Sequence, residues 1–183
     1  MAEFVMKHLL AKAGRGDVSA ESAALHPDEL GSDIHSGTRR VLTRHGISFV
    51  PRRAWLLDAA KASEYDLIVG MDSYNMADLR RLVYPDDRPK LHRMLEFAGV
   101  ARDVADPWYT GDFDATYADV ESGCAAILRL LDGNAPKCAK SRLQSVGNFG
   151  ILSTPFWKSK EKNIHADNQS VDSQGTPSSC NSF

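Results

Sequence analysis

A short stretch of the sequence, residues 103–113 (DVADPWYTGDF), places a carboxylate directly before a proline, two aromatic residues and a glycine. A residue that precedes proline favours extended backbone, so Asp106 is expected to project its carboxylate from a loop. Trp108 and Tyr109 could wall a slot for a flat ring, and Gly111 lets the loop bend. Aromatic walls that exclude water would raise the pKa of a nearby carboxylic acid, and a raised pKa suits the acid to proton donation. The alternative is an ordinary turn whose aromatic residues pack into the core, because Asp and Pro are common in loops.

The cysteines lack a pattern for nucleophilic or metal chemistry. Cys124 lies on the apolar stripe of an expected helix and is predicted to be a buried thiol, whereas Cys138 and Cys180 lie beyond that helix. None is followed by glycine-rich backbone donors and an arginine, which would activate a thiol and hold an anion. Three cysteines without a C-x-x-C pair argue against a disulfide framework and a zinc site. A reducing cytoplasm is the simplest location.

Other residue types give weaker signals. His35 and His45 flank a basic helix, and all six histidines lack metal-ligand spacing, so surface roles are expected. The helix's arginines form a face that is usually solvated, although an acidic partner could use it. No glycine-rich phosphate loop of the nucleotide-binding types occurs. We therefore expect neither a metal nor a cofactor.

Composition limits the class of protein. The 183 residues are 43% hydrophobic and 25% charged, which predicts one soluble domain with a tail. The formal net charge of -2 does not favour nucleic acid or an anionic membrane as a partner. The amino-terminal apolar run is too short for a signal peptide, and no segment approaches the roughly 20 apolar residues that span a bilayer.

Hydrophobic spacing predicts the elements that must position these residues. In chain order they are a helix over 1–14 with Met1, Phe4, Val5 and Leu9 on one stripe, a strand over 18–25, a helix over 37–45, a strand over 65–70, a helix from a Ser73 cap to Leu82, and a helix over 117–131 capped by Asp112 or Asp114. Strands that alternate with amphipathic helices predict an α/β domain with a parallel sheet over residues 1–131. Residues 132–183 are rich in small polar residues and predict a disordered tail, although its few apolar residues could dock on the domain. The first helix opens without a capping residue.

The chain from Met1 to about Leu131 resembles the low-molecular-weight protein tyrosine phosphatase family, the bacterial branch most closely. The resemblance rests on MAEFVMKHLL, SAALHPDELGSDIHSGTRRVLTRHGI, YDLIVGMDSYNMADLRRL and, most specifically, DPWYTGDFDATYADVESGCAAILRLL. It implies a three-layer sandwich in which helices flank a short parallel sheet, the phosphotyrosine phosphatase I-like fold. It also implies that Asp106 is the general acid and base, and that Trp108 and Tyr109 line a slot for the phenyl ring of phosphotyrosine or of a small aryl phosphate.

The sequence departs from the family at one decisive place. Family members begin with a central strand and a phosphate loop, C-x-G-N-x-C-R-S-P, that runs into a helix starting like MAEF, and this loop does not occur in the 183 residues. No cysteine is followed by arginine at the sixth position, which is Leu130 after Cys124 and Gln144 after Cys138. We therefore expect an amino-terminal truncation: either Met1 is an internal methionine of a longer reading frame, or the gene is broken.

Loss of the central first strand would leave two facing sheet edges with unpaired backbone groups. Tail residues could fill this gap, another copy could pair with it through the exposed edges, or the chain could fail to fold.

Three functional hypotheses stay open. In the family's mechanism a thiolate attacks phosphorus, the aspartic acid protonates the leaving phenolate, and the same carboxylate then activates water. In the first hypothesis, the gene encodes a tyrosine phosphatase that starts upstream of Met1. In the second, the chain is a catalytically dead module that binds aryl phosphate or has a regulatory role. In the third, it is a non-functional fragment. The related branches that act on phosphoarginine or reduce arsenate are not separated by these residues.

Overall fold

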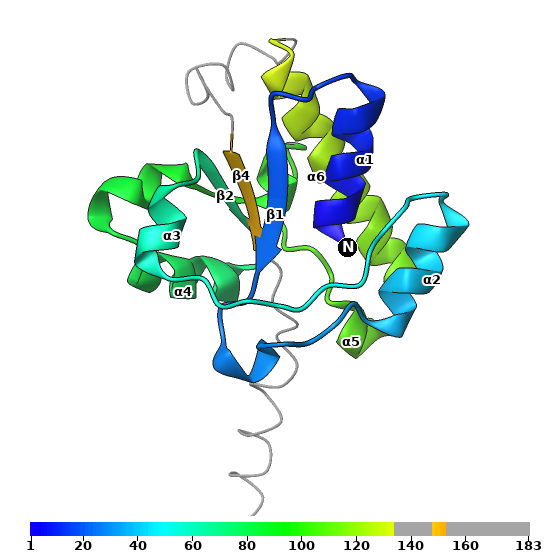
Figure 1. Cartoon of the computed structure of the whole chain (residues 1–183), viewed down its shortest axis with the longest axis horizontal. Helices are drawn as coiled ribbons and strands as arrows, with labels where there is room; N and C mark the ends of the chain where they lie inside the picture. The colour runs from blue at the N-terminus through cyan, green and yellow to red at the C-terminus, as the bar shows by residue number, and fades with distance from the viewer. Residues whose placement is uncertain (134–147, 153–183) are drawn as a thin grey trace, which may run out of the picture.

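A short parallel sheet forms the middle layer of the protein. The computed structural model describes residues 1–133 and 148–152, and within them four strands lie in the order β1-β4-β2-β3. Their bounds are Ser19–Ala23 for β1, Leu67–Gly70 for β2, Leu91–Arg93 for β3 and Asn148–Leu152 for β4, and every pairing is parallel. Helices flank the sheet on both sides (Figure 1). The expected three-layer α/β sandwich is confirmed.

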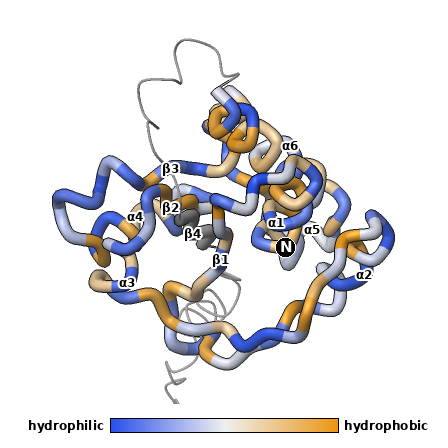
Figure 2. Tube along the Cα trace, turned by 45° about the horizontal axis from the view of Figure 1, so that its top comes forward, coloured by the Kyte–Doolittle hydropathy of each residue, from blue (hydrophilic) through white to orange (hydrophobic). Residues whose placement is uncertain are grey.

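Two hydrophobic clusters hold the layers together. On one face of the sheet lie α1 (Ala2–Lys12) and α6 (Phe113–Leu131), and on the other lie α3 (Ala59–Ser63) and α4 (Ser73–Leu82). Strand β2 is buried on both faces, because Leu67 and Val69 join the first cluster and the intervening Ile68 joins the second. Apolar residues recur between polar ones along α6 in Figure 2, as expected of a helix with one face in the core.

All four predicted helices occur, with corrected ends or caps. Helix α2 covers Ser36–Arg44, and α6 begins at Phe113 with Asp112 as its cap. Helix α4 is capped by Asp72, whose side chain accepts from the Asn75 amide, and not by Ser73 as predicted. Helix α1 has no side-chain cap, as the sequence indicated. No helix in the described part of the chain is long and apolar enough to cross a membrane.

The apolar stripe of α1 is wider than its spacing predicted. The sequence placed Leu9 in it, but Leu9 is only partly buried. The buried residues of this helix are Ala2, Glu3, Phe4, Val5, Met6 and Leu10. The first turns are thus buried almost all round, since α6 packs on one side and the sheet on another. This explains why the simple helical pattern did not capture the buried set.

Several short elements were not predicted. They are the helix α5 (Pro107–Thr110), α3, β3 and the 3-10 helices η1 (Pro27–Glu29), η2 (Pro85–Lys90) and η3 (Met94–Glu96). Each covers six residues or fewer, which is too short to show a hydrophobic period. Their formation therefore depends on the packing of the surrounding chain.

The position between β1 and β2 is occupied by the carboxy-terminal strand β4. Ser19–Ala23 pair with Asn148–Leu152, and Leu67–Gly70 pair with Phe149–Leu152 from the other side. The expected open gap is therefore absent, and of the three outcomes considered, filling by tail residues is the one observed. The prediction of a disordered tail is wrong for residues 148–152. Of the rest of that tail, Asp132 and Gly133 form a turn, and residues 134–147 and 153–183 lie outside the described residues.

Candidate active site

A cavity of about 460 Å³ opens at the carboxyl ends of β1 and β2. Its walls come from the start of α1, the residues that follow each of these strands, the loop 104–108 and the first turns of α6. Ligands of open parallel sheets bind beside the carboxyl ends of the strands. The volume lies within the range of small-molecule sites. This cavity is therefore the candidate active site.

Asp106 lies in the cavity wall with one free carboxylate oxygen. Its Oδ1 accepts a hydrogen bond from the Trp108 amide at 2.9 Å and so caps α5, whereas its Oδ2 is buried and has no hydrogen-bond partner within the described residues. Two hydrogen bonds fix the start of the loop: the Val104 amide donates to the Met71 carbonyl at 3.0 Å, and the Thr116 hydroxyl donates to the Ala105 carbonyl at 2.8 Å. One oxygen thus positions the carboxylate while the other is available to a ligand.

An aromatic wall faces the same cavity. Trp108 lines it and meets the His35 ring edge to face, with ring centroids 6.1 Å apart. His35 in turn stacks on Phe113 at 5.0 Å and 2°, and its Nδ1 accepts from the Gly37 amide at 3.1 Å. A Cβ at Gly37 would lie 2.5 Å from the Phe113 ring, so only glycine permits this stack.

The two aromatic residues of the loop differ in position. Trp108 is 43% exposed and lines the cavity, but Tyr109 is 53% exposed and is not among the residues that line it. In this short helix successive side chains point in different directions, so the two neighbours cannot both face one slot. The aromatic partners of Trp108 are instead His35 and Phe113, which come from other parts of the chain.

Two further carboxylates lie near Asp106. Burial raises the pKa of the Asp72 carboxyl, and the charges of Asp103 and Asp106 raise it further. For Asp103, burial also favours the neutral form, but hydrogen bonds from Ser73 and Arg93 outweigh it and lower its pKa. The raised pKa favours the protonated state of Asp72, which lines the same cavity as Asp106.

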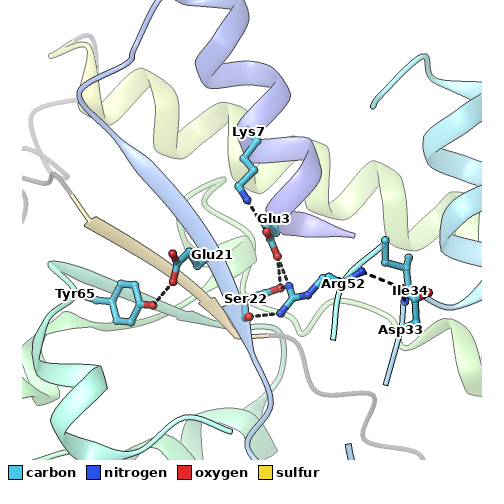
Figure 3. A network of polar contacts seen from close by, with 8 residues as sticks. All are labelled: Glu3, Lys7, Glu21, Ser22, Asp33, Ile34, Arg52 and Tyr65. Carbon is cyan, nitrogen blue, oxygen red and sulfur yellow. Dashed lines mark hydrogen bonds and ion pairs between the residues drawn. The ribbon is translucent and has the colours of Figure 1, made fainter. Parts of the chain in front are cut away.

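Arg52 also lines the cavity, and Figure 3 shows the polar network that holds its guanidinium. Its Nη1 donates to the Glu3 carboxylate and to the Ser22 hydroxyl, and the Ser22 hydroxyl donates to Glu3 Oε2 at 2.6 Å. The neighbouring residue Glu21 accepts from the Tyr65 hydroxyl on the other face of the sheet, as alternation along a strand requires. The network connects α1, β1 and the segment after α2, so it fixes the wall of the cavity.

Cys124 cannot serve as the nucleophile in this arrangement. Its side chain is fully buried in α6, and its Sγ lies 3.9 Å from the Ala2 carbonyl. Burial raises the pKa of this thiol to about 12, so the thiolate is not populated near neutral pH. The prediction of a buried core thiol is confirmed. Cys138 and Cys180 lie outside the described residues.

The structure brings together residues that the sequence did not connect. His35 was expected to be a surface histidine, and Arg52 and Asp72 were not singled out. For Asp72 a signal existed, because an Asp directly after a buried strand and before a helix is a common cap. For Arg52 no local signal existed, since its side chain is held by Glu3 and Ser22, which are far away in the chain. His35 caps α2 through the nearby Gly37 amide, but its aromatic partners Trp108 and Phe113 are distant.

Comparisons with known proteins are consistent with this geometry. A family model described as low molecular weight phosphotyrosine protein phosphatase matches residues 1–137. The low molecular weight protein-tyrosine-phosphatase YfkJ of Bacillus subtilis is 32% identical over 131 residues, which are 70% of this chain and 84% of that protein. The corresponding phosphatase PtpA of Staphylococcus haemolyticus is 32% identical over 132 residues, 72% of this chain and 84% of that protein.

Solved structures give the same result. The crystal structure of YfkJ superposes with a TM-score of 0.68 at 30% identity and covers 74% of this chain and 87% of that one. The low molecular weight protein tyrosine phosphatase SP-PTP of Streptococcus pyogenes gives a TM-score of 0.62 at 34% identity, covering 79% and 83%.

Proposed function

The chain belongs to the low-molecular-weight phosphotyrosine protein phosphatase family, and we propose that its cavity binds the aryl phosphate of phosphotyrosine with Asp106 directed at the leaving oxygen. The observation that carries this proposal is the buried Asp106 Oδ2, which has no hydrogen-bond partner within the described residues although Oδ1 is fixed by the Trp108 amide. A carboxylic acid held in this way can protonate a phenolate, which leaves poorly as an anion because its pKa is about 10.

The aromatic wall supports an aryl ligand. Trp108 and His35 both line the cavity, and aromatic rings accept a flat ring by stacking or edge contact. Phosphotyrosine in a protein, or a small aryl phosphate, would place its ring here and its phosphoryl group toward the carboxyl ends of the strands. Phosphoprotein substrates fit a cytoplasmic enzyme, the location that the cysteine pattern favours.

We also propose that these 183 residues bind aryl phosphate without turning it over. Hydrolysis through a cysteinyl phosphate requires a thiolate and an arginine six positions later, and no cysteine of the sequence has that arginine. Cys124 is buried with a pKa of about 12. Because catalytic groups act as a unit, a general acid without its nucleophile contributes almost nothing to the rate.

Binding and turnover are tested on the purified chain with phenyl phosphate and p-nitrophenyl phosphate. We expect saturable binding of phenyl phosphate by calorimetry and no release of p-nitrophenol above the buffer rate. Trp108→Ala should weaken binding at least tenfold because it removes the slot wall, whereas Tyr109→Ala, a neighbour outside the cavity, should bind like the unaltered chain. Turnover like that of an ordinary phosphatase would refute the absence of a nucleophile, and the lack of saturable binding would refute the aryl-phosphate site.

The role of Asp106 gives a separate prediction. Replacement by Asn keeps the cap to the Trp108 amide but removes a negative charge that faces the phosphoryl group, so Asp106→Asn should tighten phenyl phosphate binding severalfold near neutral pH. Asp112→Asn is the matched control, because Asp112 caps α6 and does not line the cavity. Equal affinity of Asp106→Asn and the unaltered chain would show that this carboxylate does not face the ligand.

A further inference from the structure

A second cavity, of about 700 Å³, lies between α4, η2 and β3. It shares no lining residue with the candidate active site. Its lining residues are Ser73, Met76 and Arg80 of α4, Arg88 and Pro89 of η2, Leu91, His92 and Arg93 of β3, and Glu96 of η3. Neither the family assignment nor the proposed function uses this cavity.

Three guanidinium groups from three different elements line this cavity. Within the described residues, the guanidinium groups of Arg80 and Arg88 make no hydrogen bond or ion pair. Arg93 is oriented by its Nη1, which lies 3.2 Å from Asp103 Oδ1. The cavity's carboxylate, Glu96, is already engaged, since its Oε1 lies 3.5 Å from His92 Nδ1 and its Oε2 accepts from the Arg93 amide at 3.4 Å. The cavity therefore has a surplus of positive charge.

The number and type of these cations favour a phosphate group. Guanidinium forks match the oxygens of phosphate and carboxylate alike, but two unpaired guanidiniums and a third beside them balance a dianion better than a single negative charge. A phosphate monoester carries close to two negative charges at neutral pH and offers three acceptor oxygens. Phosphate is therefore the better match for this set of donors.

The remaining walls indicate that the phosphate is attached to a larger molecule. The volume exceeds that of a bare anion severalfold, and the lining beside the arginines includes the exposed Pro89 and the edges of the buried Met76 and Leu91. Strand β3 ends the sheet order, so its outer edge makes no strand pairing within the part of the chain that the structure describes. An unpaired edge presents N–H and C=O groups that an extended peptide can use.

We propose that this cavity is a second phosphate site that binds a phosphorylated, extended protein segment along β3. Arg80 and Arg88 hold the phosphate from two sides, Arg93 supports them from the strand, and the apolar residues contact the side chains next to the phosphorylated one. The site goes beyond the proposed function, because binding here involves neither Asp106 nor the cavity at the ends of β1 and β2.

The test uses a fluorescent peptide of valine and threonine residues with one central phosphoserine, together with its unphosphorylated form. Anisotropy titration should show binding of the phosphorylated form only, and Arg80→Ala with Arg88→Ala should weaken it at least tenfold, because two charge-assisted contacts are lost. The control is Arg81→Ala with Arg129→Ala, which removes the same charge from α4 and α6 outside the cavity and should change the affinity less than twofold. Thermal unfolding by circular dichroism checks that both double variants are folded.

Each other outcome is decisive. Equal affinity of the two double variants would overturn the site, and so would equal binding of the two peptides. Inorganic phosphate that binds as tightly as the phosphopeptide would refute the protein segment as ligand. Trp108→Ala should bind the phosphopeptide normally, because Trp108 does not line the second cavity. The peptide experiment therefore gives a clear answer even if the proposed aryl-phosphate site is wrong. Loss of phosphopeptide binding in Trp108→Ala would place the peptide in the first cavity instead.

Discussion

Replacement of Gly150 by proline is expected to abolish the cooperative unfolding of this protein. Gly150 lies in the middle of β4, where its backbone is in register with Glu21 of β1 and with Ile68 of β2. Proline has no N–H to donate and is excluded from strands that are paired on both edges. We expect the free energy of unfolding to fall by about 3 kcal/mol or more, a large part of the total stability of a domain of this size. Urea titration followed by circular dichroism measures it.

Two comparisons separate the loss of β4 pairing from a nonspecific destabilisation of the protein. Gly150→Ala keeps the N–H donor and should retain a cooperative transition. A chain that ends at residue 133 should melt without cooperativity, because within the described residues only β4 connects β1 to β2, whereas a chain that ends at residue 157 keeps β4 and should melt cooperatively. Similar transitions for Gly150→Pro and the unaltered chain would show that β4 does not close the sheet in solution.

Loss of the Glu3 charge is expected to have the second largest effect. Glu3 is only 8% exposed, and its carboxylate joins Lys7 Nζ at 2.6 Å, the Ser22 hydroxyl at 2.6 Å and the Arg52 guanidinium. Glu3→Gln leaves the Arg52 charge without its anionic partner in the cavity wall, and breaking one side of such a pair costs about 3 kcal/mol. Denaturant unfolding measures the loss, and a double-mutant cycle with Arg52→Met isolates the pair.

The matched control for Glu3 is Lys7→Met. The Lys7 side chain is 49% exposed, so its pair with Glu3 is a surface contact and should contribute about 1 kcal/mol or less. A cost for Lys7→Met as large as that for Glu3→Gln would mean that the network in Figure 3 does not depend on the Arg52 contact.

The same network predicts how stability depends on pH. Burial opposes the charge of Glu3, but hydrogen bonds from Lys7 and Ser22 and the charge of Arg52 outweigh it, and the pKa lies below the usual 4.5. A carboxyl with a depressed folded-state pKa contributes stability above its unfolded pKa and loses it as the pH falls toward the folded value. The unaltered chain should therefore lose stability from about pH 5 downward, and Glu3→Gln should show a shallower decline over that range. Parallel curves for the two proteins would contradict this assignment.

Features encoded locally could be predicted from the sequence. The spacing of Val120, Cys124 and Ile127 placed α6 correctly, because an amphipathic helix repeats its apolar residues within a few positions. The apolar run of β2 and the glycine that ends it indicated a buried parallel strand. The Asp-Pro-Trp sequence of residues 106–108 drew attention to Asp106 and Trp108, and both line the cavity. Their restricted backbone and aromatic character are properties of adjacent residues.

Only the tertiary structure decided which segment closes the sheet and which side chains face the cavity. The sequence of residues 148–152 shows no strand signal strong enough to outweigh its polar surroundings, and their pairing with β1 and β2 depends on backbone hydrogen bonds formed more than 75 residues away. Likewise Arg52 and His35 line the cavity because Glu3, Ser22 and Phe113 hold them there, while Tyr109 is not among the lining residues. The direction of a side chain and the partner of a strand are set by non-local packing, which local sequence patterns do not encode.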